Sequence, residues 1–313
     1  MPVAKSLWHI DSTSSTIRQE KLSPINDDLI LRSLYSMISI GTERIVASGN
    51  VPESMYAKMQ VPYMQGAFSF PVKYGYSLVG EWNGRVYHIM HPHQDHITCS
   101  PDSLTEIPTE IPAKRAVLIS NLETICNAWW DAQPEQFEKI LIAGFGLIGS
   151  LLAIWLKLKG FHNIFILEKI EERILLAKKL GFQTILPSEK MDFDLAYHTS
   201  STSAGLQYCI DHMKFEGRII DLSWYGDKPV SLTLGGNFHI NRLKLMSSQV
   251  STIPGFLQKD QTFSTRKNEV LQMLNNKIWD ILLDQETSLE NAVNWFKKIR
   301  SGQLANLSLV IKY

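Results

Sequence analysis

The feature that most constrains this chain is a short apolar run that ends in a glycine-rich turn. Residues 140–143 are all apolar, and the next six residues read Gly-Phe-Gly-Leu-Ile-Gly. A helical pattern, Leu147–Lys159, begins inside this turn, and a second apolar run over residues 164–167 ends at Glu168. Strand, glycine turn, helix, strand and acid follow each other in this order in the βαβ unit that binds a dinucleotide.

Each glycine of the turn has its own physical task. Gly144 lets the chain turn tightly off the strand, and Gly149 lets the helix pack closely on that strand. Gly146 has no Cβ, so a pyrophosphate can approach the backbone there. The helix start at Leu147 and Ile148 offers free N–H groups and a positive dipole end to the phosphates.

The acid after the second strand indicates which dinucleotide is bound. The carboxylate of Glu168 can accept hydrogen bonds from the adenosine ribose hydroxyls, and it would repel a 2′-phosphate. We therefore expect NAD(H) rather than NADP(H), although the neighbouring Lys169 could attract such a phosphate. A methyltransferase remains an alternative, because it also places a glycine-rich turn after its first strand and an acid after its second.

Length, charge and cysteine usage narrow the class of protein. With 313 residues and 44% hydrophobic content, the chain can bury a large core, and its length predicts two domains. The 31 basic and 31 acidic residues balance, so no long-range field attracts nucleic acid or an anionic membrane. The scattered Cys99, Cys126 and Cys209 argue against a disulfide framework or a cysteine-rich zinc lobe.

Targeting signals are not evident in the sequence. The first eleven residues lack the long apolar core of a secretory signal. Apolar stretches stay far below the roughly 20 residues that span a bilayer. We expect a cytoplasmic protein with no membrane partner.

Two halves of different composition are joined by an expected helix at Leu118–Ala132. Residues 1–120 alternate short extended pieces with Pro- and Gly-rich turns, which predicts a β-rich domain. Residues 121–262 alternate strands with helices, which predicts a parallel sheet. Residues 263–313 should form two helices, Ser264–Leu283 and Ser288–Arg300, and a strand, Leu307–Lys312, that returns to the first domain.

Individual elements can be assigned by periodicity and by their flanking glycines. The expected strands of the β-rich domain are Leu29–Met37, Tyr76–Trp82 and Arg85–Met90. The expected strands of the parallel sheet are Ile140–Ala143, Ile164–Leu167, Gln183–Leu186, Leu195–His198, Arg218–Leu222 and Lys244–Ser247. The expected helices between them are Leu147–Lys159, Glu171–Leu180 and Ser203–Met213, with Gly160 and Gly181 just beyond the first two.

Motifs outside the glycine turn carry a family resemblance. The segment Ile40–Glu43 reads I-G-T-E and resembles the C-G-T-D segment of the medium-chain dehydrogenase/reductase family, which includes the zinc alcohol dehydrogenases. Residues 75–81 are similar to its G-H-E-x-x-G-E segment, and the glycine turn falls where its coenzyme loop belongs. The resemblance runs over nearly the whole chain. It implies an α/β fold with a Rossmann doubly wound parallel sheet and a β-rich GroES-like catalytic domain.

The departures from this family concern its metal. The family's catalytic zinc takes a cysteine where this chain has Ile40, and a histidine and a glutamate where it has Tyr76 and Ser77. The four-cysteine structural zinc loop is also missing. The resemblance is therefore to a divergent branch without the zinc ligands. It implies hydride transfer between nicotinamide and a small-molecule alcohol, carbonyl or activated alkene, helped by hydrogen-bond donors. A non-catalytic, nucleotide-binding regulatory protein remains open.

Proton-transfer candidates follow from the same comparison. Thr42 matches the family's hydroxyl that passes a proton from the substrate, or it simply caps a turn. Glu43 is either a general base or an ordinary carboxylate at a helix start. Tyr76 stands where the zinc histidine would be, so its phenol either donates to a substrate carbonyl or fills the volume that the metal vacated.

The histidine-rich segment from His88 to His96 contains H-x-H-x-D-H, which resembles the metal-binding signature of the metallo-β-lactamase superfamily. No glycine pair follows Asp95 and His96, and the later histidines of that fold would fall in the nucleotide-binding segment. A bound metal, a catalytic His91 or His93, and a plain strand end on the surface all remain open. We take His91 as the catalytic candidate and expect no metal.

Further coenzyme contacts are expected where strands end. Thr199 and Ser200 follow the fourth strand of the parallel sheet, at the carboxyl edge where ligands bind. Leu222, Ser223 and Tyr225 follow the fifth, where the resemblance places the nicotinamide ring, although aromatics here could equally serve the core or a dimer contact. The resemblance also implies a homodimer formed through the sixth strand.

Overall fold

The structure, a computed structural model, describes residues 3–24, 27–302 and 304–313. The chain forms two compact units, one from residues 1–120 and 274–313 and the other from residues 121–273. Residues 263–273, which we assigned to the C-terminal return, group with the second unit. In the described ranges, no helix is long and apolar enough to cross a membrane.

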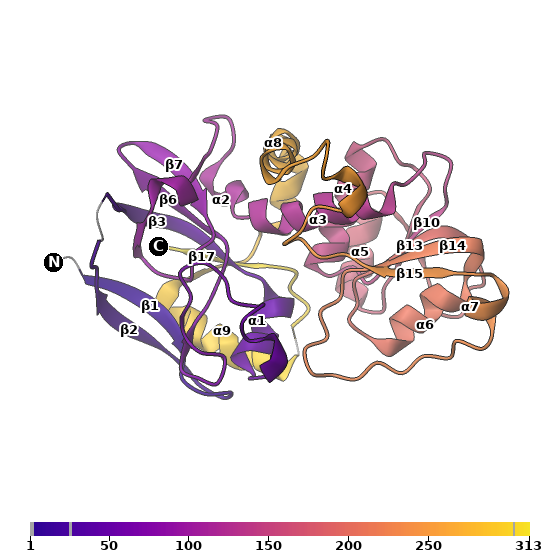
Figure 1. Ribbon diagram of the computed structural model, residues 1–313, viewed down its shortest axis with the longest axis horizontal. Coiled ribbons are helices and arrows are strands. Elements are labelled where there is room, and N and C mark those ends of the chain that lie inside the picture. Colours follow the sequence, from indigo (N-terminus) through magenta and orange to yellow (C-terminus); the bar gives the residue numbers. More distant parts are fainter. Residues whose placement is uncertain (1–2, 25–26, 303) are drawn as a thin grey trace. The chain divides into compact units, whose positions relative to one another are not determined.

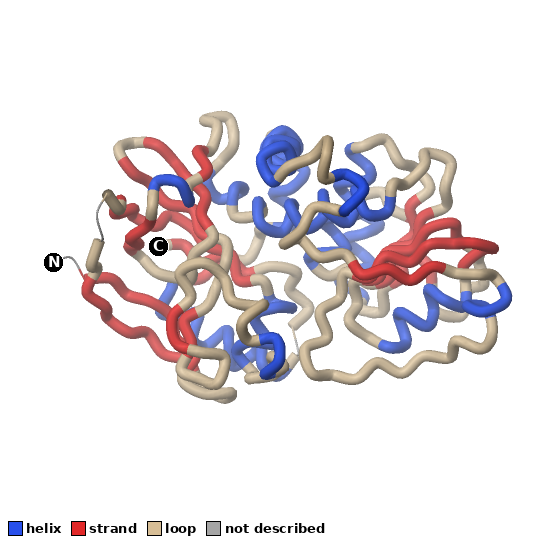
Figure 2. Tube along the Cα trace, viewed as in Figure 1, coloured by secondary structure: helices blue, strands red, loops and turns tan. Residues whose placement is uncertain are grey.

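The second unit is built on a parallel sheet, drawn in red in Figure 2, with the strand order β12-β11-β10-β13-β14-β15. Its strands are β10 (Ile140–Ala143), β11 (Ile164–Leu167), β12 (Gln183–Ile185), β13 (Phe193–His198), β14 (Met213–Asp221) and β15 (Lys244–Ser247). All six expected strands are confirmed. Strand β14 starts earlier than expected. Its residues 214–216 are exposed, so no continuous apolar run marked this part of the strand in the sequence.

Helices cover both faces of this sheet. Figure 1 shows α4 (Leu147–Leu158) on one side and α6 (Ser203–Asp211) on the other. Two residues of α6, Leu206 and Ile210, pack with Leu141, Ala143 and Phe193 of the strands. The expected helices are confirmed. Helices α4 and α5 end just before Gly160 and Gly181, which adopt φ values of +89° and +81°. The helices of this unit are α3 (Ile119–Ala132), α4 (Leu147–Leu158), α5 (Glu171–Lys179), α6 (Ser203–Asp211), α7 (Asn237–Ile240) and α8 (Phe263–Leu274).

The first unit is β-rich, as expected, and contains two sheets. One sheet has the order β2-β1-β5-β4, formed by β1 (Val3–His9), β2 (Ser15–Lys21), β4 (Gln65–Gly66) and β5 (Val72–Lys73). The other has the order β16-β17-β3-β6-β7-β9, with β8 also paired to β3. Its strands are β3 (Leu29–Ile38), β6 (Leu78–Trp82), β7 (Arg85–Ile89), β8 (His96–Cys99), β9 (Thr105–Glu106), β16 (Glu286–Ser288) and β17 (Leu309–Lys312).

Strand β17 pairs antiparallel with β3, so the C-terminal segment joins the larger sheet of the first unit. Helix α9 (Leu289–Ser301) buries Leu289, Ala292, Phe296 and Ile299 in the same core as β1 and β17. The other helices of this unit are α1 (Ile40–Ala47) and α2 (Ala113–Ala116), and short 3₁₀ turns lie at Glu53–Met55, Pro101–Ser103, Gly255–Leu257 (in the second unit) and Lys277–Leu282.

The single helix expected over 264–283 is wrong in its second half. Helix α8 ends at Leu274, and a separate 3₁₀ segment, Lys277–Leu282, follows. The side chain of Asn276 accepts a hydrogen bond from the Ile278 N–H at 3.0 Å and so starts this new segment. The pair Asn275-Asn276 was the local signal for this break.

Candidate coenzyme and proton-transfer sites

The three glycines of the turn have different surroundings. At Gly144, with φ +107°, a Cβ would lie 2.9 Å from the Ser200 backbone. At Gly149 a Cβ would lie 2.0 Å from the Gly144 carbonyl oxygen. At Gly146, by contrast, the nearest atom is the Arg173 Nη1 at 3.7 Å. Two glycines are therefore required by packing, and the third leaves an open approach to the start of α4, where a pyrophosphate would fit.

Glu168 lies beside this turn and is held by backbone N–H groups. Its Oε2 accepts from the Phe145 N–H at 2.8 Å. Its Oε1 accepts from the N–H groups of Lys169 at 2.7 Å and Ile170 at 3.1 Å. The carboxylate is nearly buried, at 8% exposure, so its position next to the glycine turn is fixed. Its remaining lone pairs can accept hydrogen bonds from ribose hydroxyls.

Arg173 is a charged neighbour of this carboxylate that the sequence analysis did not single out. Its Nη1 lies 3.7 Å from the Glu168 Oε2, and the same guanidinium is the nearest group to the open side of Gly146. The available signal was a basic residue in the first turn of the helix that follows the acid. The side chain of Arg173 is half-buried, whereas that of Lys169 is exposed.

At the carboxyl edge of β13 and β14, several expected coenzyme residues surround the buried His198 and the partly buried Asp221. His198 Nδ1 lies 3.0 Å from the Asp221 Oδ1, and His198 Nε2 lies 2.8 Å from the Ser200 Oγ. Tyr225 donates its hydroxyl to Asp221 Oδ2 at 2.9 Å. Ser223 Oγ lies 3.2 Å from the His198 Nδ1. Sequence reasoning missed this pair, although the two residues end adjacent parallel strands and therefore meet.

The charge of Asp221 is stabilised by its neighbours. Burial acts to raise the pKa of this carboxyl, but the hydrogen bond from His198 and the Ser223 N–H together bring the pKa below its ordinary value. The loop after β13 is also tied to the glycine turn, because Thr199 Oγ1 donates to the Gly144 carbonyl at 2.8 Å. The N–H of Leu222 donates to the carbonyl of His198 at 3.0 Å. The two strand ends and the glycine turn therefore form one hydrogen-bonded edge.

In the first unit, the I-G-T-E segment opens α1. Thr42 is half-buried, whereas the Glu43 side chain is fully buried. Glu43 Oε1 accepts from the Ser39 N–H at 2.8 Å, and its Oε2 lies 2.9 Å from the His93 Nε2. Ile40 packs against an apolar core cluster. Glu43 is thus both a helix-start carboxylate, as one of its two interpretations held, and the partner of a histidine.

The second family motif places a tyrosine at the edge of the core. Tyr76 is half-buried, and its ring meets the buried Tyr74 edge-on at 6.2 Å between centroids. Its carbonyl accepts from the Ser120 Oγ at 2.8 Å, and the neighbouring Ser77 donates its hydroxyl to the Val117 carbonyl at 2.6 Å. Ser77 is therefore a structural residue, while Tyr76 keeps part of its side chain accessible.

The histidines of the 88–96 segment have separate partners. His88 Nε2 lies 3.2 Å from the hydroxyls of both Ser77 and Ser120. His88, His91 and His93 are all buried, so the interpretation as a surface strand end is wrong for them. Over residues 3–24, 27–302 and 304–313, no three His, Cys, Asp or Glu side chains lie together in a group that could hold a metal ion.

His91 is poorly suited to act as a base. Its Nδ1 lies 2.8 Å from the Pro92 carbonyl, and its ring lies 5.0 Å from that of Tyr63, centroid to centroid. Burial lowers the pKa of His91 to about 3. The imidazole is therefore neutral at physiological pH, and a group with such a pKa takes up a proton only weakly.

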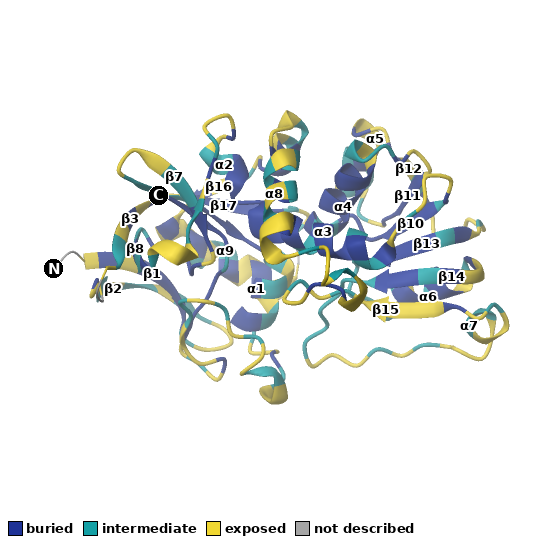
Figure 3. Ribbon diagram, turned by 45° about the horizontal axis from the view of Figure 1, so that its top comes forward, coloured by how far each residue is buried: buried dark blue, intermediate teal, exposed yellow. Residues whose placement is uncertain are grey.

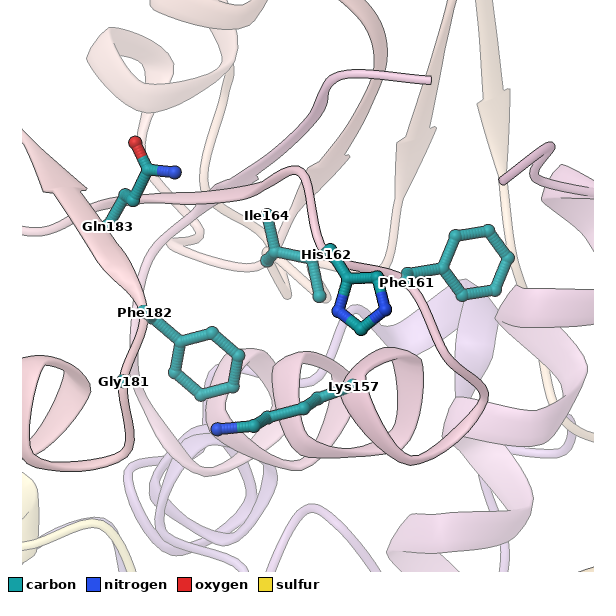
Figure 4. Close-up of a pocket in the computed structure, with 7 residues that line it drawn as sticks. All are labelled: Lys157, Phe161, His162, Ile164, Gly181, Phe182 and Gln183. Atoms are coloured by element: carbon teal, nitrogen blue, oxygen red, sulfur yellow. The ribbon is translucent and has the colours of Figure 1, made fainter. Parts of the chain in front are cut away.

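The second unit also contains a hollow (Figure 4). It sits at the amino-terminal ends of β11 and β12, the opposite edge of the sheet from the glycine turn. The Lys157 ammonium that lines it donates to the Leu180 carbonyl at 2.6 Å. The lining residues are Lys157, Phe161, His162, Ile164, Gly181, Phe182 and Gln183. We assign no ligand to it.

No protein-family model matches the chain. The chain is similar to the (R,R)-butanediol dehydrogenase of Saccharomyces cerevisiae, with 27% identity over 154 residues, or 44% of this chain. The match covers only 40% of the length of that relative.

Solved structures resemble the chain over its whole length. The 2R,3R-butanediol dehydrogenase of Bacillus subtilis matches with a TM-score of 0.76 and 14% identity, and the match covers 100% of each chain. The acetophenone reductase of Geotrichum candidum, solved in complex with NAD, matches with a TM-score of 0.77 and 16% identity, over 100% of this chain and 98% of that one. The expected architecture is therefore confirmed: the chain has the fold of the medium-chain alcohol dehydrogenases, with a GroES-like unit and a Rossmann unit.

Proposed function

We propose that this protein is an NAD(H)-dependent dehydrogenase or reductase that works without zinc. It would transfer a hydride between the nicotinamide C4 and an alcohol, a carbonyl or an activated alkene carbon. The observation that carries the proposal is the Glu168 carboxylate, fixed beside the open face of Gly146 at the start of α4. This arrangement supports binding of ribose and pyrophosphate together.

The coenzyme would be held by the second unit. Glu168 supports NAD(H) over NADP(H), because a buried carboxylate repels a 2′-phosphate, while Arg173 limits that preference by supplying a cation nearby. The hydroxyls of Thr199, Ser200 and Ser223 and the ring of Tyr225 would line the nicotinamide half. The fixed edge that they form with the glycine turn supports this assignment.

Proton transfer would be handled by the first unit. Thr42 and Tyr76 are both half-buried and carry hydroxyls that can donate and accept. Ile40 offers no metal-binding atom, which supports a mechanism based on hydrogen bonding and positioning. We give His91 no proton-transfer step, because burial keeps its imidazole neutral at physiological pH. We give Glu43 a supporting role, through its contact with His93.

The substrate would be a small alcohol or ketone, since the similar proteins are named for butanediol and acetophenone. We place the enzyme in the cytoplasm, which its free, buried cysteines support. A homodimer would form through β15, because this strand lies at the edge of the sheet and its four residues are exposed, as the yellow strand in Figure 3 illustrates.

Turnover is tested with protein treated with a chelator and shown by metal analysis to be zinc-free. NADH oxidation is followed with acetophenone and 2,3-butanedione, and NAD reduction with butane-2,3-diol and benzyl alcohol. The proposal expects turnover of at least one compound without added metal. Turnover that appears only after zinc is added contradicts the zinc-free mechanism. Tight NADH binding without any turnover favours the regulatory alternative.

A further inference from the structure

A fully buried polar pair lies in the first unit, next to the two candidate proton-transfer motifs. The side chains of Glu43 and His93 are both 0% exposed, and their Oε2 and Nε2 atoms are 2.9 Å apart. The other carboxylate oxygen accepts the N–H of Ser39, the residue before α1. Glu43 therefore fixes the start of the helix whose first turn carries Thr42.

His93 also contacts the second motif. A Cβ at Gly75 would lie 3.0 Å from the His93 Nε2 and 3.1 Å from its Cδ2, so the imidazole rests against the Gly75 backbone. Gly75 has φ +138° and directly precedes Tyr76. One imidazole thus touches the backbone before Tyr76 and, through Glu43, holds the helix that carries Thr42.

The other ring nitrogen of His93 is also engaged. Its Nδ1 lies 2.8 Å from the Ser36 Oγ, and this hydroxyl lies 2.8 Å from the Tyr313 hydroxyl. An ionised carboxylate can only accept, so Nε2 donates to Glu43. The hydroxyls of Ser36 and Tyr313 can each donate or accept, so the chain remains bonded whether Nδ1 accepts from Ser36 or donates to it. The ring is held in place in either protonation state.

Such a cluster is costly for a structural role alone. A buried ionic pair contributes little to stability compared with apolar packing of the same volume, because both groups lose their hydration. Fully satisfied buried networks instead fix geometry. Here the geometry that is fixed is that of the two residues proposed to handle the proton.

We infer that His93 is a positioning residue of the proposed reaction: it aligns Thr42, through Glu43 and α1, with Tyr76, through Gly75. This inference rests on the proposed function. Misplacing a reacting group by about 1 Å can cost about 10²-fold in rate. Loss of the His93–Glu43 contact should therefore lower kcat and leave coenzyme affinity unchanged, because the coenzyme residues belong to the second unit.

Two substitutions separate the contacts of the ring. In His93→Gln the side-chain amide can replace Nε2 and donate to Glu43. In His93→Asn the shorter amide can replace only Nδ1, which faces Ser36. A matched control is His9→Gln, since His9 is an equally buried histidine of the same unit and its Nδ1 bonds to Ser15 at 2.9 Å.

Three quantities are measured: kcat with whichever of the four test compounds is turned over, the NADH dissociation constant, and amide hydrogen exchange at Ser39. We expect kcat to fall about 10²-fold or more in His93→Asn, with faster exchange at Ser39, and much less in His93→Gln. NADH affinity should stay within about twofold of wild type. The inference is overturned if His93→Asn, His93→Gln and His9→Gln all have the same kcat. It is also overturned if hydrogen exchange at Ser39 in His93→Asn is the same as in wild type. If the wild type neither binds NADH nor turns over, the proposed function fails, and Ser39 exchange still decides whether His93 holds α1.

Discussion

At the scale of single residues, the glycine turn separates packing from binding. A methyl group at position 149 would collide with the Gly144 carbonyl oxygen at 2.0 Å, whereas one at position 146 would meet no atom closer than 3.7 Å. The two positions therefore differ in what a side chain disturbs. One substitution affects the fold of the turn, and the other affects the space that a pyrophosphate would use.

The matched pair Gly146→Ala and Gly149→Ala tests this difference. Gly149→Ala should lower the free energy of unfolding by about 1–3 kcal/mol through overpacking. Gly146→Ala should change it by no more than about 0.5 kcal/mol, yet weaken NADH binding by about tenfold or more. Urea unfolding and NADH titration measure both effects. If Gly146→Ala binds NADH with wild-type affinity, Gly146 does not border the space that the pyrophosphate would use.

Asp221 makes the stability of the second unit depend on pH. Its folded-state pKa lies below its ordinary value of about 3.9. Its stabilising contribution is therefore present above the unfolded-state pKa and is lost as the pH falls through the folded-state value. We expect Asp221→Asn to lower the free energy of unfolding by about 1–3 kcal/mol at neutral pH. This difference should become progressively smaller below about pH 4.

Urea unfolding of wild type and variant at several pH values measures this difference, with Asp227→Asn as the control, since Asp227 is an exposed carboxylate on the following loop. A difference that stays constant down to about pH 3 would show that Asp221 is not stabilised as a carboxylate.

At the scale of elements, hydrophobic runs and glycines predicted strands and helix ends well, whereas strands of polar sequence were not predicted. The buried strand β10 and the helix ends at Gly160 and Gly181 follow from local sequence. Strand β2, with the sequence S-T-I-R-Q-E-K, has no apolar run, and it is defined by its pairing with β1. The sheet of β1, β2, β4 and β5 was therefore not expected.

The candidate site shows the same division. The glycine turn and Glu168 lie in one βαβ unit, so their spacing in the sequence reveals them. The pairs His198–Asp221 and Glu43–His93 join residues far apart in the chain, and no local pattern connects them. Such pairs follow only from strand order and register.

Helix α9 offers a test of a single element. The Ser288 Oγ accepts from the Asn291 N–H at 3.2 Å and so caps the helix that buries Phe296. Ser288→Ala should cost about 0.5–2 kcal/mol of unfolding free energy, while Ser288→Asp, which keeps an acceptor, should cost much less. Thermal or urea unfolding of the two variants distinguishes them. Equal stability of Ser288→Ala and wild type would mean that the cap is not used.

At the scale of the whole molecule, β15 determines the expected assembly. Leu245 and Met246 on this edge strand are 40% and 41% exposed. An exposed edge strand presents unpaired N–H and C=O groups, which are a template for pairing with another strand. We expect Leu245→Lys to weaken the dimer strongly, measured by sedimentation. Phe137→Lys, which changes a residue that is 76% exposed but outside β15, serves as the control. A monomeric wild type, or an unchanged dimer in Leu245→Lys, contradicts this interface.

The central claim is that the glycine turn and Glu168 bind NAD(H). Its most direct test is a titration of the protein with NADH and NADPH, followed by energy transfer from its tryptophans. The comparison variant is Glu168→Gln, with Glu172→Gln as an exposed control. We predict saturable binding with NADH preferred over NADPH by about tenfold or more, equivalent to about 1.4 kcal/mol. This preference should narrow in Glu168→Gln and persist in Glu172→Gln. Binding of neither coenzyme, or preference for NADPH in the wild type, would contradict the account.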